Sequence, residues 1–305
     1  MRVAILGASG IGYVHARLYN KLGAAVTSIM CRSDIKAKQI ASDLLNNFGI
    51  VAKPFSDINR IFEEELDAVS ICTPPALHLE QIIAALDRKI PVFCEKPLFW
   101  NENYRSIDII QNLKILKEHP NRKIFVNTSN TVFIDTISKN FGKVNLTKNF
   151  NFEFFTNGQS EGLDIAIDLF PHGLSLLLHI FGECEISKFS WKIKRNNFFC
   201  QFVYGGCYVN FDFREDVNGP RHLLIGLDDK KYKRIQEGRD ASYKVHLKDE
   251  DTNEIIPSQD PFEIYLSEFI NFCSKQEKQT PDNFYTASLN MKLMATCLKL
   301  INQKV

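Results

Sequence analysis

The stretch RVAILGASGIGYVHARLYNKLG near the N-terminus constrains the fold more than any other. It reads as a buried strand, a glycine-rich turn and a helix. In this context the spacing of Gly7, Ser9 and Gly12 fills the G-x-G-x-x-G frame of a dinucleotide-binding loop, with serine at the middle position. We expect Gly10 to supply the missing room, and the phosphates to bind amides at the helix start beside Ile11. The alternative is a tight turn used only for packing.

The end of the second predicted strand, MCRSD, indicates which dinucleotide binds. In this fingerprint an acidic residue bonds the ribose hydroxyl, whereas an arginine accommodates a 2′-phosphate. The position is held by Arg32, followed by Ser33, and an arginine fork with a hydroxyl suits a phosphate monoester. The sequence therefore favours NADP(H). It leaves NAD(H) open, because Asp34 is either a helix N-cap or a group that reaches the ribose.

Composition limits the class of protein and its partners. A chain of 305 residues with 45% hydrophobic and 24% charged residues has the size and make-up of a globular protein of two domains. A net charge of +1 argues against nucleic acid and membrane partners, and we expect no run long enough to span a membrane. The eight cysteines lack zinc spacing, so we expect reduced thiols, no metal site and a cytoplasmic location.

Two kinds of pattern divide the chain. Residues 1–127 alternate short β-branched runs with helical segments, which predicts βαβ units and a parallel sheet. From residue 188 to 247, alternating strands separated by Asn, Gly and Asp turn signals predict an antiparallel sheet, and two helices close the chain. The predicted fold class is α/β: a Rossmann doubly wound parallel sheet in residues 1–127, then an α+β domain in residues 128–305 on a largely antiparallel open sheet. The last helix is free to pack back on the first domain.

The segment VFCEKPLFW places a charge pair inside an apolar run. In a doubly wound sheet, ligands bind beyond the carboxyl ends of the strands. The pair lies at such an end, and so does the Thr-Pro-Pro tip of the preceding strand, so both should border the nicotinamide. The alternative is a buried lysine–glutamate bridge that holds the strand end. The residues expected at the cofactor from these two strand ends are Thr73, Pro74, His78, Glu95 and Lys96.

A second constellation lies in LDIAIDLFPHGLSLLLHIFGE. Asp168 and His172 are four residues apart, which places them on one face of a helix. Because proline is tolerated only in a first turn, Pro171 predicts that this helix starts close to Asp168. The alternative is structural, with Asp168 as an N-cap and His172 packed beneath the sheet. His179 and His15 are expected to be structural.

Four segments together suggest a family. GASGIGYVHA, ICTPPALHLEQIIAAL, VFCEKPL and IDLFPHGLSLLLHIFGE, in this order and spacing, resemble the glucose-fructose oxidoreductase and inositol dehydrogenase family, Gfo/Idh/MocA. The resemblance covers most of the chain and is strongest up to residue 100 and from 163 to 183. It implies a Rossmann domain and a C-terminal domain whose open sheet often forms the interface of a homo-oligomer, a dimer or tetramer. It also implies hydride exchange between a nicotinamide and a secondary hydroxyl of a sugar or polyol.

The resemblance also assigns roles to residues. Lys96 would contact both the nicotinamide ribose and the substrate hydroxyl, while Asp168 and His172 would orient that hydroxyl and relay its proton. A lysine suits this role because burial and neighbouring positive charge lower its pKa towards neutrality. The predicted catalytic set is therefore Lys96, Asp168 and His172.

The chain departs from the family pattern around the expected pocket. Phe170 stands where relatives often have glycine, and Ser175 where many have a second acid. The arginine common after the last Rossmann strand is missing, which leaves Asn127 and Asn130 as polar candidates for substrate binding. We therefore expect a pocket that is not tuned to a typical inositol or glucose substrate.

Three functions follow, in order of preference. The first is an NADP-dependent oxidoreductase acting on a hydroxyl or carbonyl of a sugar, a polyol or a sugar-like small molecule. The second is an imine reductase of a biosynthetic pathway on the same fold. The third is a non-catalytic regulator that senses the dinucleotide, because this fold also serves as a binding module.

Overall fold

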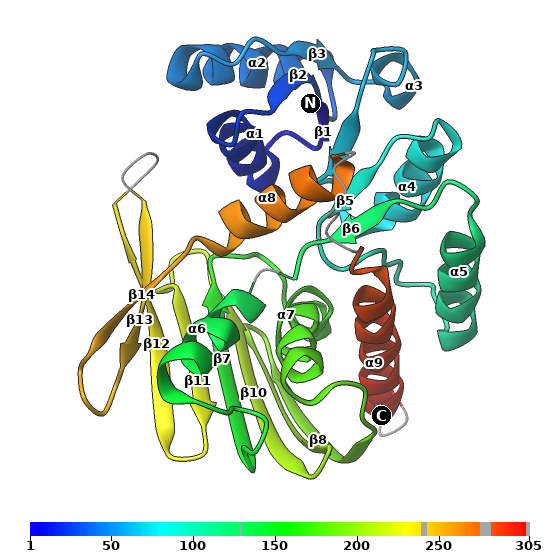
Figure 1. Ribbon diagram of the computed structural model, residues 1–305. Helices are drawn as coiled ribbons and strands as arrows, with labels where there is room; N and C mark the ends of the chain where they lie inside the picture. The colour runs from blue at the N-terminus through cyan, green and yellow to red at the C-terminus, as the bar shows by residue number, and fades with distance from the viewer. Residues whose placement is uncertain (129, 239–242, 275–281, 303–305) are drawn as a thin grey trace. The chain divides into compact units, whose positions relative to one another are not determined.

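The structure is a computed structural model of the chain, which describes residues 1–128, 130–238, 243–274 and 282–302 (Figure 1). The chain forms two compact units. The first comprises Met1–Asn127 with Phe262–Ser288, and the second Thr128–Pro261 with Leu289–Val305. Each unit is built on one sheet. The division into domains at residues 1–127 and 128–305 stays a prediction.

The sheet of the first unit has six strands, all parallel, in the order β3-β2-β1-β4-β5-β6. The central strands are buried along almost their whole length, as expected for a parallel sheet covered on both faces. This order is that of a dinucleotide-binding Rossmann sheet, so the predicted fold class is confirmed here. The strands are β1 (Arg2–Leu6), β2 (Ala25–Met30), β3 (Lys53–Phe55), β4 (Ala68–Ile71), β5 (Val92–Cys94) and β6 (Ile124–Val126).

Helix α8 returns from far along the chain to cover this sheet. Its Phe269 ring lies 5.4 Å from the ring of Phe93 on β5 and 6.2 Å from that of Phe125 on β6. The apolar stripe of α8 thereby supplies part of the core that the N-terminal segment needs. The helices of this unit are α1 (Ile11–Lys21), α2 (Asp34–Phe48), α3 (Ile58–Ile61), the 3₁₀ turn η1 (Pro75–Leu77), α4 (His78–Asp87), α5 (Ser106–Glu118) and α8 (Pro261–Cys273).

The start of α2 corrects one expectation. Ser33, rather than Asp34, is the N-cap, and its hydroxyl accepts the backbone N–H of Lys36 at 3.3 Å. Asp34 lies in the first turn, where its Oδ1 accepts a hydrogen bond from the Ser56 hydroxyl at 2.6 Å. An acid is favourable in a first turn without being the cap, because the helix dipole is positive there.

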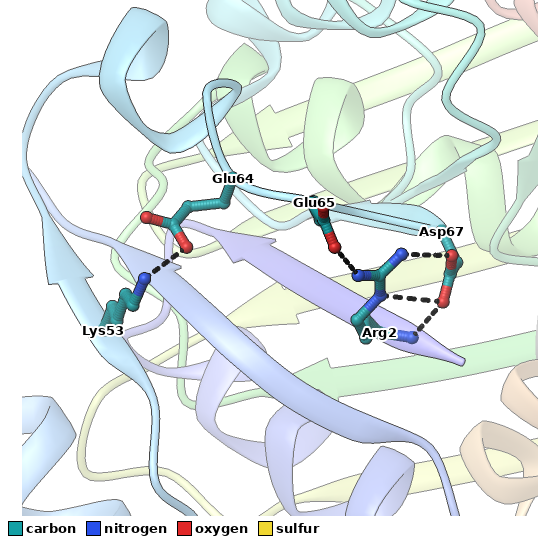
Figure 2. A network of polar contacts seen from close by, with 5 residues as sticks. All are labelled: Arg2, Lys53, Glu64, Glu65 and Asp67. Carbon is teal, nitrogen blue, oxygen red and sulfur yellow. Dashed lines mark hydrogen bonds and ion pairs between the residues drawn. The ribbon is translucent and has the colours of Figure 1, made fainter.

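Charged side chains close the amino-terminal edge of the sheet, opposite the glycine loop. Figure 2 shows Arg2, at the start of β1, between Glu65 and Asp67, and Lys53 paired with Glu64. Asp67 Oδ2 also accepts the backbone N–H of Arg2 at 2.7 Å. These side chains are largely exposed, so the pairs fix the register of the strand starts more than they stabilise the fold.

The sheet of the second unit has eight strands in the order β14-β13-β12-β11-β7-β10-β9-β8. Neighbours pair antiparallel except β7 and β10, which are parallel. The prediction of a largely antiparallel sheet is therefore confirmed. Its strands are β7 (Asn149–Thr156), β8 (Ile186–Lys194), β9 (Asn197–Tyr204), β10 (Cys207–Glu215), β11 (His222–Leu227), β12 (Lys230–Glu237), β13 (Lys244–Asp249) and β14 (Ile255–Ser258).

The expected start of the long helix on this sheet is wrong. Helix α7 begins at Leu163 and holds Pro171 in its interior, so Asp168 and His172 lie in its middle turns. An interior proline removes one helix hydrogen bond, but the helix is buried against the sheet, and that packing outweighs the local cost. Gly173 allows the close approach, because a Cβ there would lie 2.7 Å from the Phe211 ring. The helices of this unit are α6 (Thr131–Phe141), α7 (Leu163–Phe181) and most of α9 (Phe284–Asn302).

Helix α7 also bears on the expectation that no segment is long enough to span a membrane. Within the described residues, it is 19 residues long with a mean hydropathy of 1.4, enough to span by length and composition. The expectation that no segment reaches spanning length was therefore wrong. About two thirds of its apolar window is buried inside the protein, as in a core helix.

A single asparagine completes the edge of the first sheet. Asn283 Oδ1 accepts the backbone N–H of Val126 at 2.7 Å, and its Nδ2 donates to the Val126 carbonyl at 2.7 Å. The amide thus replaces a neighbouring strand at β6, 157 residues earlier in the chain. It satisfies two main-chain groups that would otherwise be unpaired in a partly buried place.

We expect Asn283→Leu to lower the free energy of unfolding by about 2 kcal/mol, because it leaves both Val126 groups without a partner. Urea unfolding of the full chain measures this. Asn46→Leu, on the exposed face of α2, should change the unfolding free energy by less than about 0.5 kcal/mol. Equal losses in the two variants would contradict the role given to Asn283.

Candidate functional site

The glycine loop is packed too closely for side chains at two of its positions. A Cβ on Gly7 would lie 2.7 Å from the backbone of Cys72 and Thr73, and one on Gly12 would lie 2.2 Å from the Gly7 carbonyl oxygen. Gly7 also has a φ of +83°, which favours glycine. The loop is thus held tightly against the end of β4, so the first turn of α1 follows β1 directly.

The outer side of the loop is open. Ser9 and Gly10 are exposed, and α1 starts at Ile11 with Gly10 as an N-cap that has no side-chain hydrogen bond. A Cβ on Gly10 would meet nothing within 4 Å. Backbone amides at a helix start, an approach free of side chains and the positive end of the helix dipole fit the phosphates of a dinucleotide.

The residues at the end of β2 are exposed beside this loop. Two backbone amides, of Gly7 and Ala8, donate to the Met30 carbonyl at 2.9 and 3.0 Å, which binds the loop to the end of β2. Arg32 follows in solvent, without an ion pair among the described residues. Ser33 is exposed too, but its hydroxyl already caps α2.

Beneath the loop lies a buried charge pair. His15 of α1, fully buried, has its Nε2 2.9 Å from Glu95 Oε1, and its Nδ1 2.9 Å from the Ser70 hydroxyl. Burial opposes charge on the imidazole, but contacts with the Cys72 sulfur and the Glu95 carboxylate raise the pKa of His15 to about 10. His15 is therefore protonated at neutral pH.

The carboxylate side of the pair is equally well held. Glu95 is 7% exposed, and its Oε1 also accepts a hydrogen bond from Asn127 Nδ2 at 2.7 Å. Burial disfavours the carboxylate, but the hydrogen bonds from His15 and Asn127 lower the pKa of Glu95. Asn127, expected at the substrate, is itself buried at the end of β6. Glu95 thus pairs with His15, and a bridge between Glu95 and Lys96 stays an alternative.

Lys96 is the next residue and is half-buried. The Thr-Pro-Pro tip is fastened beside it by His78, whose Nε2 lies 2.7 Å from the Thr73 carbonyl and whose Nδ1 lies 2.9 Å from the Pro97 carbonyl. Thr73 also donates its hydroxyl to Gln81 at 2.6 Å, while Pro74 is exposed. His78 itself is fully buried, and that burial lowers its pKa.

The second unit holds Asp168 and His172 on α7. The ring of His172 packs edge-on against Phe154 of β7 at 4.9 Å. Its Nδ1 accepts a hydrogen bond from Asn130 Nδ2 at 3.2 Å, which fixes the orientation of the ring. Asn130, the other substrate candidate, is buried. The structure therefore brings Asn130 and His172 together.

A residue missed in the sequence lies beside Asp168. Glu215, at the end of β10, is 3% exposed and hydrogen bonded to the Asp168 carboxyl. Its Oε2 accepts the backbone N–H of Ser160 at 2.7 Å, and a Cβ on Gly158 would lie 1.9 Å from that oxygen. Burial and the Asp168 carboxylate raise the pKa of Glu215 to about 7. The two acids therefore share one proton near neutral pH.

The sequence did hold a signal for Glu215. In CYVNFDFRE the buried positions alternate, so the series Cys207, Val209, Phe211 and Phe213 that faces the core ends on a glutamate. A buried acid at the end of an inward-facing apolar series needs a partner. Among the described residues, no group of three or more His, Cys, Asp or Glu could hold a metal ion.

The first part of the chain is similar to a known family of proteins. Residues 1–128 match the model of the Gfo/Idh/MocA oxidoreductase family, NAD-binding Rossmann fold. An inositol 2-dehydrogenase of Mycolicibacterium vanbaalenii is 34% identical over 119 residues, which are 38% of this chain and 32% of that protein. The match thus spans about a third of the length of this curated relative.

Solved structures resemble the chain over nearly its whole length. The UDP-N-acetylglucosamine 3-dehydrogenase of Acidithiobacillus ferrooxidans has a TM-score of 0.70 at 17% identity, covering 98% of this chain and 96% of that one. A myo-inositol 2-dehydrogenase of Lactobacillus plantarum has a TM-score of 0.71 at 17% identity, covering 100% and 98%. At this identity the likeness shows the fold alone, and it confirms the two-part fold class.

The shared proton predicts a pH dependence of stability. The folded protein keeps a proton on Glu215 up to about pH 7, whereas the unfolded chain releases it near the ordinary value of 4.5. The unfolding free energy should therefore fall as pH rises from 5 to 8, by about 1–3 kcal/mol relative to Glu215→Gln. Urea unfolding across this range measures it, with the exposed Glu161→Gln as control. Parallel curves for wild type and Glu215→Gln would refute the shared proton.

Proposed function

Residues 1–128 of this chain match the model of the Gfo/Idh/MocA oxidoreductase family, and from this we propose that the protein is an NADP-dependent oxidoreductase of a sugar, polyol or sugar-like metabolite. The observation that carries the proposal is the glycine loop. It is closely packed where Gly7 and Gly12 allow it and open where phosphates would bind. The substrate class is supported by the names of the relatives, an inositol 2-dehydrogenase and a UDP-N-acetylglucosamine 3-dehydrogenase.

The proposal places the dinucleotide on residues of the first unit. The amides at the start of α1 bind the pyrophosphate, and Arg32 binds the 2′-phosphate through its guanidinium. The preference for NADP rests on Arg32 because it is exposed, whereas Ser33 is engaged in capping α2. The full set of residues proposed at the cofactor is Gly7, Ser9, Gly10, Ile11, Gly12, Arg32, Ser33, Thr73, Pro74, His78, Glu95 and Lys96.

The chemistry is divided between the cofactor and the protein. A nicotinamide bound there would supply the acceptor or donor of the hydride that leaves or joins the substrate carbon. The protein moves the proton: we assign Lys96 to take the proton of the reacting hydroxyl, so that a carbonyl forms. Glu95 stays ionised against His15 and acts on Lys96 as a neighbouring negative charge. We assign His172 and Asp168 to orient the hydroxyl and relay the proton.

Polar partners in the second unit support these assignments. Because Asn130 donates to Nδ1 of His172, the neutral form of the imidazole carries its proton on Nε2, where it can serve as a donor. Glu215 and Asp168 together hold one exchangeable proton at neutral pH. Asn127 and Asn130 remain proposed substrate contacts. We further propose a homo-oligomer, a dimer or tetramer, in the cytoplasm.

The cofactor assignment predicts tighter binding of NADPH than of NADH. Titration of the full chain, followed by Trp100 fluorescence, should give a dissociation constant at least tenfold lower for NADPH, a difference of about 1.4 kcal/mol. Trp100 is a suitable reporter because its amide donates to the Pro75 carbonyl beside the strand end. Arg32→Asp should abolish the preference, while Arg60→Asp, an exposed arginine on α3, should keep it. Equal binding of the two dinucleotides by the wild type would contradict the assignment of Arg32 to the 2′-phosphate.

The catalytic assignment predicts the behaviour of Lys96→Ala. Turnover of dinucleotide with myo-inositol or UDP-N-acetylglucosamine, whichever the wild type oxidises, should fall about 10²-fold or more, as when a general acid–base is lost. Absorbance of the reduced nicotinamide measures it. Lys117→Ala, on the exposed side of α5, should retain full turnover. Turnover of Lys96→Ala within a few-fold of the wild type would show that another group moves the proton.

A further inference from the structure

One arginine of the second unit carries a charge that no acid balances among the residues that the structure describes. Arg234 lies on β12, is partly buried and stacks over the Phe154 ring at 5.9 Å. Among the described residues, it makes neither an ion pair nor a hydrogen bond. The titratable groups that act on it are Tyr243 and a second cation, Arg221. A charged group in such a place normally has a partner.

A neighbouring arginine shows what a balanced site on this sheet looks like. On the opposite face of β7, Arg214 stacks over Phe155 at 4.3 Å, much as Arg234 stacks over Phe154. Arg214 however donates to Asp212 at 2.7 Å. Arg214 thus has an acidic partner, whereas Arg234 has none among the described residues. The guanidinium of Arg234 is stacked on a ring, and its N–H donors can bind a ligand.

Electrostatics point the same way. Burial, and then the positive charge of Arg221, lower the pKa of Arg234 to about 10, so it still carries its charge at neutral pH. Arg221 precedes β11 and is itself held by a hydrogen bond from its Nε to Asn157 Oδ1 at 2.7 Å. Two like charges held near one another raise the local positive potential, which an anion lowers.

The position of Arg234 connects it to the proposed site. The Phe154 ring that it covers is the one against which His172 packs at 4.9 Å. Phe154 faces the core from β7, on the side of the sheet that carries α7. One aromatic ring therefore separates the unpaired guanidinium from the imidazole assigned to the substrate hydroxyl.

We propose that Arg234, supported by Arg221, binds an anionic group of the substrate, a carboxylate or a phosphate, beside His172. The inference rests on the proposed function for the identity of the site, and it narrows the substrate to an acidic sugar or polyol. A guanidinium binds both groups through two parallel N–H donors, and stacking on Phe154 holds the fork in place. The sugar acid and the phosphorylated or nucleotide-linked sugar share this chemistry.

The test is calorimetric binding to the full chain, without turnover. D-glucuronate offers a carboxylate, D-glucose 1-phosphate and UDP-N-acetylglucosamine offer phosphate, and neutral D-glucose serves as reference, all at constant ionic strength. We expect at least one of the anionic compounds to bind more tightly than glucose. Arg234→Met should weaken that binding at least tenfold, whereas Arg234→Lys should retain part of it.

Two control variants separate this site from others. Lys233→Met removes a positive charge from the adjacent residue, whose side chain points to the other face of the strand, and should leave binding unchanged. Arg32→Ala tests whether the anion sits on the dinucleotide loop instead. Circular dichroism of each variant excludes unfolding as the cause of a loss.

Each outcome decides the inference. Loss with Arg234→Met alone supports it, and the compound that binds tells carboxylate from phosphate. It is overturned if no anion binds better than glucose, if Arg234→Met binds as the wild type does, or if only Arg32→Ala loses binding. Because binding is measured without hydride transfer, an anion site in a protein that turns over no substrate would leave this inference standing and remove the proposed function.

Discussion

A buried pair of opposite charges, His15 and Glu95, holds together the end of the first sheet at which the glycine loop lies. The pair joins α1 to the end of β5, while Ser70 and Asn127 add contacts from β4 and β6. Such a pair offers little net stability over an apolar one, but losing one partner costs about 3–5 kcal/mol, because a charge is then left buried. The geometry of the loop therefore depends on both charges being present.

The same pair explains why a glutamate and a lysine are adjacent in an apolar run. Glu95 follows strand β5 directly and its carboxylate contacts His15, whereas Lys96 lies in the bend that comes next. Glu95 is buried, and Lys96 is half-buried. The buried contact with His15 thus explains the glutamate, and the proposed function assigns the chemistry to the lysine.

Local patterns predicted much of this structure, because their causes are local. The strand-turn-helix pattern at the glycine loop, the alternating strands of the second sheet and the helical spacing of α1 and α2 can be recognised from neighbouring residues. The sequence failed where a distant contact decides. Asn283 completes β6 from 157 residues away, and Glu215 at the end of β10 meets Asp168 of helix α7.

Other failures came from local rules that packing overrides. Pro171 suggested a helix start, yet its carbonyl accepts a hydrogen bond from Asn290 Nδ2 at 2.9 Å, and the helix continues through it. Strand β12, KKYKRIQE, lacks the apolar alternation of a buried strand because Tyr232 alone on it is fully buried. Because of its lysines and its arginine, the segment does not show the sequence pattern of a strand. One of them, Arg234, became the most informative side chain of that strand.

Among the described residues, the acids of the second unit do not account for the charge of Arg234. Asp168 and Glu215 hold one proton between them near neutral pH, so the pair carries one negative charge. The hydrogen bond between the two carboxyl groups stabilises that charge. Neither acid is among the groups that act on Arg234, where Tyr243 and Arg221 are felt instead. The carboxyl pair and the guanidinium therefore differ in how their charges are stabilised. The carboxyl pair can exchange a proton without binding a ligand, whereas the anion that we propose would supply the counter-charge that Arg234 lacks among the described residues.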